Sequence, residues 1–433
     1  MLVLMTNCLE RETSKEEKIE IEKDLITLAK IFNNAGYSLY LVGGTLRDRY
    51  LKRQNYDIDV ATDAMPEEVV KLFKKTIPTG IKHGTVTIRF KHKNIECTTM
   101  RKEAKYSDGR HPDSVEYGSS IIEDLKRRDF TMNAIAASLP DGIIIDPTNG
   151  KSDIKASLIR AVGNAKDRFL EDALRPIRAI RFASQLGFSI EEKTLSAIPF
   201  TLQRMKSVSI ERFQEELNKM IEGRYFERAF VLMKDSGILS VFLPELNFLS
   251  HIEIKKLLFS ISLISEKDRI SRLTLLCYWV YKNIDDKLDK VKVIYFMLKR
   301  LKYPNKTVEE ITHLINYLAF EEKDLIDDYS IRCFLKSVGK GYIERLFLLK
   351  KNITNSPDLS KFLESTYQKI TRIIKANDPL SIGELEISGN DLLALGLKGP
   401  QIGHVLTQLL DVVLKEPAKN NSQELIRLAK NML

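Results

Sequence analysis

The chain has 433 residues, too many for one ordinary hydrophobic core, so two to four domains are expected. Lysine and arginine outnumber aspartate and glutamate by 68 to 59, and the formal charge of +9 suits a polyanionic partner. The cysteines lack the paired spacing of a disulfide framework or a zinc site: Cys8, Cys97, Cys277 and Cys333. No run approaches the roughly 20 apolar residues of a membrane span, and the apolar start is too short for a signal peptide. We therefore expect a soluble protein of the cytoplasm with no membrane and no zinc.

Residues 13–35 have apolar positions at near-helical spacing and predict a leading helix. The next stretch, residues 38–62, is typical of a strand, a glycine turn, a helix, a loop and a second strand. Gly43 and Gly44 directly follow the apolar run of the first strand. Such glycines let the backbone approach a phosphate chain at a helix N-terminus, so they predict a phosphate-binding turn.

Two carboxylates, Asp57 and Asp59, lie in the second strand of this stretch. Because successive strand side chains alternate between faces, both are expected on one side, with Ile58 and Val60 on the other. Magnesium prefers oxygen ligands and usually takes one or two protein carboxylates together with substrate phosphates. The pair predicts a magnesium site, although an isolated Asp-x-Asp is more often a solvated turn.

Two stretches of alternating character, residues 84–90 and 94–100, predict strands joined by a hairpin turn. In the second strand, Glu96 lies on the face opposite to Ile95 and Cys97, which makes it a candidate third carboxylate. An exposed strand glutamate is the alternative interpretation. The polar residues 101–118 that follow have no period, and a charged stretch of this length in a compact domain is usually functional or mobile.

The segment 121–137 is expected to turn helical after Asp129, with Arg128, Asp129 and Asn133 near the helix start. Arginine suits a phosphate, and aspartate or asparagine suits ribose hydroxyls. A capped helix with a salt bridge is the structural alternative. A last strand and a turn follow at residues 141–153, and beyond about Ala156 helical periodicity continues to the end of the chain.

A helix is predicted over residues 165–187, with a kink at Pro176. One face carries an apolar stripe, and another carries charged residues three to four positions apart: Asp172, Arg175, Arg178 and Arg181. Periodicity alone favours a solvated, salt-bridged surface for this second face.

Base chemistry offers a second interpretation of the same face. Cytosine and adenine both present an amino donor beside a ring-nitrogen acceptor. A carboxylate can accept a hydrogen bond from such an amino group, and a guanidinium can donate one to the ring nitrogen. A pair formed by Asp172 and Arg175 would complement both bases and would leave groups unpaired against guanine or uracil. Arg178 and Arg181 would then brace Asp172 or reach the triphosphate.

These motifs resemble one known family. Leu-Val-Gly-Gly-x-x-Arg-Asp followed by Asp-x-Asp-x-Ala-Thr resembles the first motif of the class II CCA-adding tRNA nucleotidyltransferases and bacterial poly(A) polymerases, within the DNA polymerase β-like nucleotidyltransferase superfamily. Arg-Arg-Asp-Phe-Thr-x-Asn-Ala and Glu-Asp-x-x-Arg resemble further motifs of this family. The segment 209–220 resembles its Glu-Arg motif, which implies supporting roles for Glu211, Arg212 and Glu216. Residues 101–118 resemble the loop of enzymes that add the terminal A, and residues 387–404 resemble the tail that grips tRNA.

The resemblance implies an α+β fold, in which a small mixed β-sheet nucleotidyltransferase domain with a palm-like sheet and helices precedes an extended all-α region. We expect a catalytic head at residues 1–150, a neck with the base-selecting helix at 151–225, a helical body at 226–330 and a tRNA-binding tail at 331–433. The implied reaction is stepwise, template-free addition of CCA to the 3′ end of tRNA from CTP and ATP, with release of pyrophosphate.

The resemblance also implies roles for individual residues. Asp57 and Asp59 are expected to hold two Mg²⁺ ions, with help from Glu96. The nucleotide is expected to contact the remaining candidates, which comprise the glycine turn, the basic and polar residues near it and the base-selecting helix: Gly43, Gly44, Arg47, Arg128, Asp129, Asn133, Asp172, Arg175, Arg178 and Arg181.

Three alternatives share much of this pattern. A poly(A) polymerase would have the same catalytic block, but typically a different segment before Arg-Arg-Asp and a basic tail. An A-adding enzyme that works with a CC-adding partner would keep both the loop and Asp-x-x-Arg. An RNA-binding protein on the same scaffold would need no metal ligands, whereas this chain keeps Asp57, Asp59 and Glu96.

Overall fold

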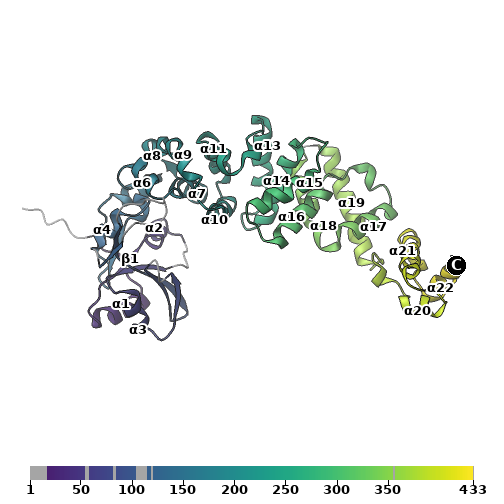
Figure 1. The fold of residues 1–433 in the computed structure, drawn as a ribbon, viewed down its shortest axis with the longest axis horizontal. Coiled ribbons are helices and arrows are strands. Elements are labelled where there is room, and N and C mark those ends of the chain that lie inside the picture. Colours follow the sequence, from purple (N-terminus) through teal and green to yellow (C-terminus); the bar gives the residue numbers. More distant parts are fainter. Residues whose placement is uncertain are drawn as a thin grey trace, which may run out of the picture. The chain divides into compact units, whose positions relative to one another are not determined.

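The computed structural model describes residues 17–53, 58–80, 84–103, 115–118, 120–354 and 356–432 (Figure 1). The chain divides into two compact units, Met1–Pro244 and Glu245–Leu433. The first contains a mixed sheet followed by helices, and the second is built from helices. This confirms the expected α+β class, while the finer division into head, neck, body and tail stays a prediction.

A seven-stranded sheet forms the centre of the first unit. Its order is β3-β4-β5-β2-β1-β8-β9, and β2 and β5 run parallel while the other neighbours are antiparallel. The strands have these bounds: β1 (Leu39–Val42), β2 (Ile58–Thr62), β3 (Thr76–Gly80), β4 (Thr85–Phe90), β5 (Lys93–Thr99), β8 (Ala136–Leu139) and β9 (Ile144–Ile145). The parallel pair places β2 beside β5, and both carry candidate carboxylates.

Most predicted strands of this sheet are present. The expected hairpin joins β4 to β5 through Lys91 and His92, whose φ angles of 44° and 67° are typical of a two-residue hairpin turn. Strand β3 was not predicted from the sequence. It contains Pro78 and lies at the edge of the sheet, where a missing N–H removes no ladder hydrogen bond.

The helices of the sheet domain are short: α1 (Lys23–Asn34), α2 (Gly44–Tyr50), α3 (Pro66–Leu72), α4 (Ile121–Lys126) and α5 (Gly150–Lys155). The leading helix starts later than predicted, because the residues before it extend along the sheet instead. The Ile19 N–H donates to the Gly142 carbonyl at 3.0 Å, and the Ile144 N–H donates to the Glu17 carbonyl at 2.9 Å. These backbone bonds compete with a first helical turn.

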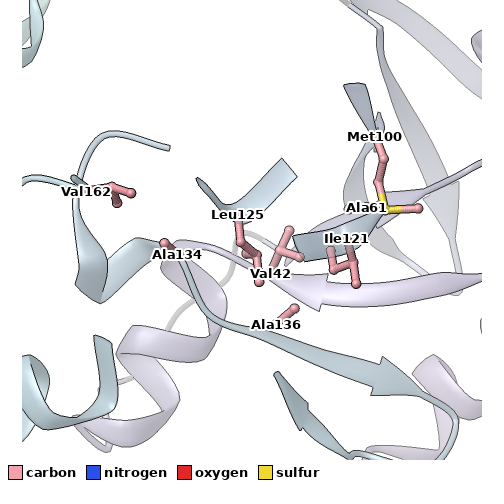
Figure 2. Packing of buried hydrophobic residues seen from close by; sticks show 8 residues of the cluster. All are labelled: Val42, Ala61, Met100, Ile121, Leu125, Ala134, Ala136 and Val162. Atoms are coloured by element: carbon pink, nitrogen blue, oxygen red, sulfur yellow. The ribbon is translucent and has the colours of Figure 1, made fainter. Parts of the chain in front are cut away.

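A buried hydrophobic cluster holds α4 against the sheet (Figure 2). Its members come from β1, β2, α4, β8 and neighbouring segments: Val42, Ala61, Met100, Ile121, Leu125, Ala134, Ala136 and Val162. Burial of apolar surface on this scale fixes the helix relative to the strands. The residues after α4 are therefore held near the end of β1, where the glycine turn begins.

The charged loop at residues 101–118 starts and ends in strands. Strand β6 (Arg101–Glu103) pairs antiparallel with β7 (Val115–Tyr117), with Arg101 opposite Tyr117. The aperiodic sequence predicted neither strand, because their pairing depends on contact between the two ends of the loop and not on a local pattern. The middle of the loop lies outside the described residues.

The rest of the first unit is mainly helical, with a two-residue parallel pair, β10 (Leu158–Ile159) and β11 (Ser189–Ile190), as an exception to the expected all-helical extension. The single helix predicted over 165–187 is two helices, α6 (Ala165–Glu171) and α7 (Arg175–Leu186). Asp172 between them is extended, and Pro176 lies in the first turn of α7, where its fixed φ and missing N–H are tolerated. The predicted kink at Pro176 is therefore a break between two separate helices. The helices that follow are α8 (Glu192–Ala197), α9 (Leu202–Met205), α10 (Ile210–Ile221), α11 (Phe226–Asp235) and α12 (Ile238–Phe242).

In the second unit, every regular element of the part that the structure describes is helical. The α-helices are α13 (His251–Ser262), α14 (Arg269–Asn283), α15 (Lys290–Arg300), α16 (Asn305–Leu318), α17 (Asp328–Val338), α18 (Ile343–Ile353), α19 (Pro357–Lys375), α20 (Gly389–Ala394), α21 (Pro400–Lys415) and α22 (Ser422–Asn431). Gly396 and Gly399 have positive φ just before α21, so the glycine-rich tail segment does precede a helix start. Across the described ranges, none of the helices has the length and apolar character needed to cross a membrane.

Candidate functional site

The turn between β1 and α2 lies against three charged side chains. A Cβ atom built on Gly43 would be 3.0 Å from Nη1 of Arg128 and 3.4 Å from Oδ2 of Asp59. One built on Gly44 would be 3.5 Å from Nη2 of Arg47 and 3.8 Å from the same Asp59 oxygen. Gly43 also has a φ of 67°, which side chains disfavour. The two glycines therefore make room for a carboxylate and two guanidinium groups at one point, and all three of these groups are among the predicted site residues.

Asp59 projects from β2 in the predicted direction. Its side chain is half-buried, whereas Ile58 and Val60 are buried in the core, which confirms the alternation of faces. The backbone N–H of Asp59 donates to Oγ1 of Thr45 at 2.9 Å, so α2 helps to fix this position on the strand. Asp57 lies outside the described residues, and its place beside Asp59 stays a prediction.

Glu96 is the direct neighbour of Asp59 on the adjacent strand. The parallel pairing of β2 with β5 aligns Asp59 with Glu96, and residues aligned in this way share a face of the sheet. The Glu96 side chain is exposed. Within the described ranges, which omit Asp57, no group of three metal-ligating side chains is present. Two adjacent carboxylates nevertheless supply the hard oxygen donors that a divalent ion prefers, so the residues fit such an ion.

A chain of hydrogen bonds joins α2 to α7 through the segment after α4. Nη1 of Arg47 donates to Oδ1 of Asn133 at 2.8 Å, and Nδ2 of Asn133 donates to Oδ1 of Asp129 at 3.3 Å. The other oxygen of Asp129 accepts from Nε of Arg178 at 2.9 Å. Four of the predicted site residues are thus brought together in one network.

The helix predicted after Asp129 is wrong beyond a single turn. Only Thr131–Asn133 form a 3-10 turn, and the apolar residues that follow enter strand β8, where Ala136 to Leu139 pair with β1. Pairing with β1 in the central sheet stabilises this apolar run more than its weak helical propensity would, because tertiary contacts commonly override such propensities.

The carboxyl group of Asp129 is held ionised. Burial raises its pKa, but the charges of Arg178 and Arg175 and the hydrogen bonds from Arg178 and Asn133 outweigh burial, and the pKa is about 2. Asp129 therefore places a fixed negative charge beside these arginines, and its contact with a ribose stays a prediction.

Asp124 holds Arg127 and the predicted phosphate-binding residue Arg128, and it was not among the residues predicted from the sequence. Its carboxylate is buried and accepts hydrogen bonds from Nε of Arg127 at 2.9 Å and from Nη2 of Arg128 at 3.0 Å. Burial raises its pKa, yet the charges of Arg128 and Arg127 bring it below the ordinary value. The spacing of three and four residues on a helix is the signal that would have revealed these pairs.

Asp172 and Arg175 lie at the break between α6 and α7, each with its own partner. Both oxygens of Asp172 accept from Nη2 of Arg212, at 3.2 and 3.0 Å. Arg175 is buried, and its Nη1 donates to Oε2 of Glu171 at 2.7 Å while its Nη2 donates to the Arg127 carbonyl at 3.2 Å. The structure therefore places the proposed base-selecting pair at one junction, and its joint contact with a base stays a prediction.

Arg178 and Arg181 donate hydrogen bonds to carboxylates other than Asp172. Arg178 pairs with Asp129, and Nε of Arg181 donates to Oε2 of Glu216 at 2.8 Å. The hydrogen-bonded brace of Asp172 is Arg212, so the two arginines bind other carboxylates, and the alternative that they reach the triphosphate stays a prediction. The expected supports Arg212 and Glu216 are in contact with this region.

The interpretation of this face as solvated is also wrong for two of its arginines. Arg175 and Arg181 are only 7% and 8% exposed, because α6 and the residue after α4 contact Arg175 and α10 contacts Arg181. The Arg181 guanidinium lies 3.5 Å from the centroid of the Phe182 ring, and burial together with the charge of Arg178 lowers its pKa to about 10. Helical periodicity shows that residues share a face but not what packs on that face.

Three family models match successive parts of the chain. Residues 39–160 match the poly A polymerase head domain, and residues 187–249 match a model described as the probable RNA and SrmB-binding site of polymerase A. Residues 286–429 match domain 2 of tRNA nucleotidyltransferase. The first match contains the glycine turn, the carboxylate strands and the Arg128 segment.

Similar proteins extend over almost the whole chain. The CCA-adding enzyme of Lactobacillus johnsonii is 35% identical over 417 residues, which cover 93% of this chain and 95% of the relative. The CCA-adding enzyme of Leuconostoc citreum is 33% identical over 405 residues, with coverages of 92% and 94%.

Solved structures show the same likeness. The Bacillus stearothermophilus CCA-adding enzyme in complex with CTP is 31% identical, with a TM-score of 0.76 and coverage of 94% of this chain and 96% of that structure. The Thermotoga maritima CCA-adding enzyme complexed with tRNA_CCA has a TM-score of 0.62 at 21% identity, with coverage of 94% of both chains, and shows the fold alone. From the head-domain match and these relatives, the chain belongs to the CCA-adding enzymes, the tRNA nucleotidyltransferase and poly(A) polymerase family of nucleotidyltransferases.

Proposed function

We propose that this protein adds CCA stepwise to the 3′ end of tRNA, using CTP and ATP without a nucleic-acid template and releasing pyrophosphate. The observation that carries the proposal is the convergence of Asp59, Arg128 and Arg47 on the glycine turn, with Glu96 beside Asp59. Relatives named CCA-adding enzymes, and solved relatives described with CTP, with ATP and with tRNA_CCA, support it. The cytoplasm is the proposed location.

Enzymes of this type use divalent metal ions, and we propose Mg²⁺ for this chain. Asp57 and Asp59 would hold the ions, with help from Glu96. When bound, two such ions lower the pKa of the attacking 3′ hydroxyl and offset charge on the leaving pyrophosphate. Arg128 and Arg47 supply fixed positive charge beside the turn for the triphosphate, and the missing Cβ atoms at Gly43 and Gly44 let the phosphates approach the backbone.

The selection of bases is proposed to rest on Asp172 and Arg175. A guanidinium has five N–H donors, and the partners of Arg175 in the described part of the chain take three of them: the Arg168 carbonyl, Glu171 and the Arg127 carbonyl. Donors on Nε and Nη2 remain for a ring nitrogen. Asp172 accepts from Arg212 and from the Leu174 N–H, and a carboxylate has about four acceptor sites, so it can still accept from the amino group of cytosine or adenine.

An incorporation assay tests the proposal. Purified protein, Mg²⁺ and each labelled nucleotide are combined with three tRNAs that end at the discriminator base, at C and at CC. We expect CTP to be added to the first two substrates and ATP only to the third. Long A tails would instead indicate a poly(A) polymerase, and activity on the CC-ending tRNA alone would indicate an A-adding enzyme. No incorporation on any substrate would favour an RNA-binding protein.

A further inference from the structure

A cavity in the first unit, apart from the glycine turn, combines positive charge with an exposed aromatic ring. Its volume is about 530 Å³, within the range of small-ligand sites. It lies between the segment before α6 and the segment from α8 to the 3-10 turn Pro199–Thr201. The side chains that give it chemical character are Arg160, Lys166, Glu191, Lys193 and Phe200.

Phe200 is held outward by its own neighbours. Its side chain is 70% exposed, although Ile198 and Thr201 on either side are fully buried. Oγ1 of Thr201 donates to the Ile198 carbonyl at 2.8 Å, which closes the turn beneath the ring. Nζ of Lys166 lies 5.2 Å from the ring centroid, within the range of a cation–π contact. The ring is thus anchored in place with most of its surface in solvent.

The charge of this cavity is positive after internal pairing. Arg160 is shared between Asp153, at 3.1 Å, and Glu191, at 3.2 Å, so one guanidinium faces two carboxylates and this trio keeps a single negative charge. Lys166 and Lys193 are exposed, and neither forms an ion pair with any residue that the structure describes. The two ammonium groups therefore outweigh the remaining negative charge, and the walls of a cavity that also contains an aromatic face are positive overall.

We propose that this cavity binds one nucleotide of the RNA substrate, with its base stacked on Phe200 and its phosphate held by Lys166 and Lys193. Aromatic stacking beside cations is how proteins bind single-stranded nucleic acid without reading its sequence. The proposal rests on the proposed function, because it takes RNA as the substrate. A free nucleotide has the same chemistry as a nucleotide within RNA, and the experiments below distinguish these two ligands.

The first experiment measures the Kd of a tRNA that lacks CCA for variants at the ring. We expect Phe200→Ala to raise the Kd roughly 5-fold to 150-fold, the range for the loss of one stacked base. Phe200→Trp keeps an aromatic face and should bind as the wild type does. Phe200→Leu keeps apolar bulk without that face and should bind as weakly as Phe200→Ala, whereas rescue by Leu would reduce Phe200 to a structural role and overturn the proposal. Thermal unfolding verifies that each variant is folded.

The second experiment measures the dependence of the Kd on salt concentration. The double variant Lys166→Gln with Lys193→Gln should lower the slope of log K against log salt by about 0.7 for each phosphate that a lysine no longer neutralises. Lys71→Gln, an exposed lysine of α3 outside the cavity, is the matched control and should leave the slope unchanged. An equal slope in wild type and double variant would overturn the proposal, as would weaker CTP or ATP binding with an unchanged Kd for RNA.

Incorporation kinetics separate this proposal from the proposed function. At saturating tRNA, the Phe200→Ala variant should keep kcat within about twofold of the wild type, while its KM for tRNA rises with the Kd. If the wild type incorporates neither CTP nor ATP, the proposed function fails, and the Kd measurements still decide whether the cavity binds RNA. A fall in kcat with an unchanged KM would overturn the RNA-binding role of this cavity.

Discussion

Arg212 and Asp172 lie forty positions apart in the sequence, and Nη2 of Arg212 donates to both oxygens of the Asp172 carboxylate, at 3.0 and 3.2 Å. Asp172 is in the break between α6 and α7, where the backbone N–H of Leu174 also donates to its Oδ1 at 3.0 Å. Arg212 on helix α10 is the side chain that contacts both oxygens, so α10 helps to set the direction in which this carboxylate points. The proposed base acceptor depends on a residue outside its own motif.

Replacing Arg212 by leucine should impair the use of both CTP and ATP. A hydrogen bond between charged groups contributes about 1.5–3 kcal/mol, so we expect kcat/KM for each nucleotide to fall roughly 10- to 100-fold. Arg212→Lys keeps the charge and should recover part of this loss. The matched control is Lys219→Leu, which removes an exposed cation from the same helix. Equal activity of Arg212→Leu and Lys219→Leu would show that Arg212 does not position Asp172.

Replacing Gly43 by alanine should impair nucleotide binding more than folding. The new Cβ would lie 3.0 Å from Nη1 of Arg128 and 3.4 Å from Oδ2 of Asp59, so one of these groups must shift. We expect KM for the nucleotide to rise on the order of 10-fold, equivalent to about 1.4 kcal/mol. Steady-state incorporation with CTP on a tRNA ending at the discriminator base measures it.

Gly36 provides the control for backbone strain. Its φ is 88°, and a Cβ there would have nothing within 4 Å, so Gly36→Ala carries the positive-φ penalty without a collision. We expect a loss of stability of about 1 kcal/mol and unchanged kinetics. If Gly36→Ala impaired incorporation as much as Gly43→Ala, backbone strain rather than the contacts of the turn would explain the effect.

Local patterns in the sequence predicted the parts of the site that local geometry determines. The glycine turn and the face of Asp59 follow from strand alternation and backbone freedom, and they are found as predicted. Contacts between distant segments could not be predicted in this way, because they depend on how α10 packs on α7. The partners of Asp172 and Arg181 are both on α10, and periodicity alone placed these residues in solvent.

The fold shows the same distinction between local and tertiary causes. The segment after Asp129 has helical spacing, but its apolar residues complete the central sheet as β8. Strand β3 escaped prediction because Pro78 argues against a central strand and is compatible with an edge. Asp124 was missed although its spacing to Arg127 and Arg128 was visible, since only burial distinguishes a structural carboxylate from a solvated one.

The stability of the protein should depend on pH through Asp129. Its pKa of about 2 lies below the ordinary value of 3.8, so the folded state favours the ionised form. The resulting stabilisation is fully present above about pH 4 and is lost as the pH falls toward 2; the shift corresponds to about 2 kcal/mol. Urea unfolding of the wild type and of Asp129→Asn between pH 5 and pH 2 measures it.

The pH dependence of the unfolding free energy should differ between the wild type and Asp129→Asn if Asp129 acts as proposed. The difference in unfolding free energy between wild type and Asp129→Asn should shrink by about 2 kcal/mol from pH 5 to pH 2, because protonation removes the charge that the variant lacks. Asp141→Asn removes an exposed carboxylate and is the control for loss of charge. A difference that stays constant over this range would contradict a stabilising contact between ionised Asp129 and Arg178.

The carboxylates of the sheet should differ in how strongly they affect metal-dependent incorporation. Asp59 faces the glycine turn, so Asp59→Asn is expected to lower kcat on the order of 10³-fold, the equivalent of about 4 kcal/mol. Glu96 is exposed on the neighbouring strand, and Glu96→Gln should lower kcat about 10-fold and raise the Mg²⁺ concentration needed for half-maximal rate. Asn94→Ala, two residues along the same face of β5, is the matched control.

Binding of Mn²⁺ to the protein alone, followed by its electron paramagnetic resonance signal, separates a metal ligand from a residue that orients substrate. Loss of Mn²⁺ affinity in Asp59→Asn and in Asp57→Ala would assign both carboxylates to the metal, including the one outside the described residues. Weaker incorporation by Glu96→Gln with unchanged Mn²⁺ affinity would assign Glu96 to positioning, because a ligand cannot be removed without a change in affinity. Unaltered Mn²⁺ affinity in Asp59→Asn would mean that the ion is held elsewhere, and the carboxylate beside the glycine turn would not be a metal ligand.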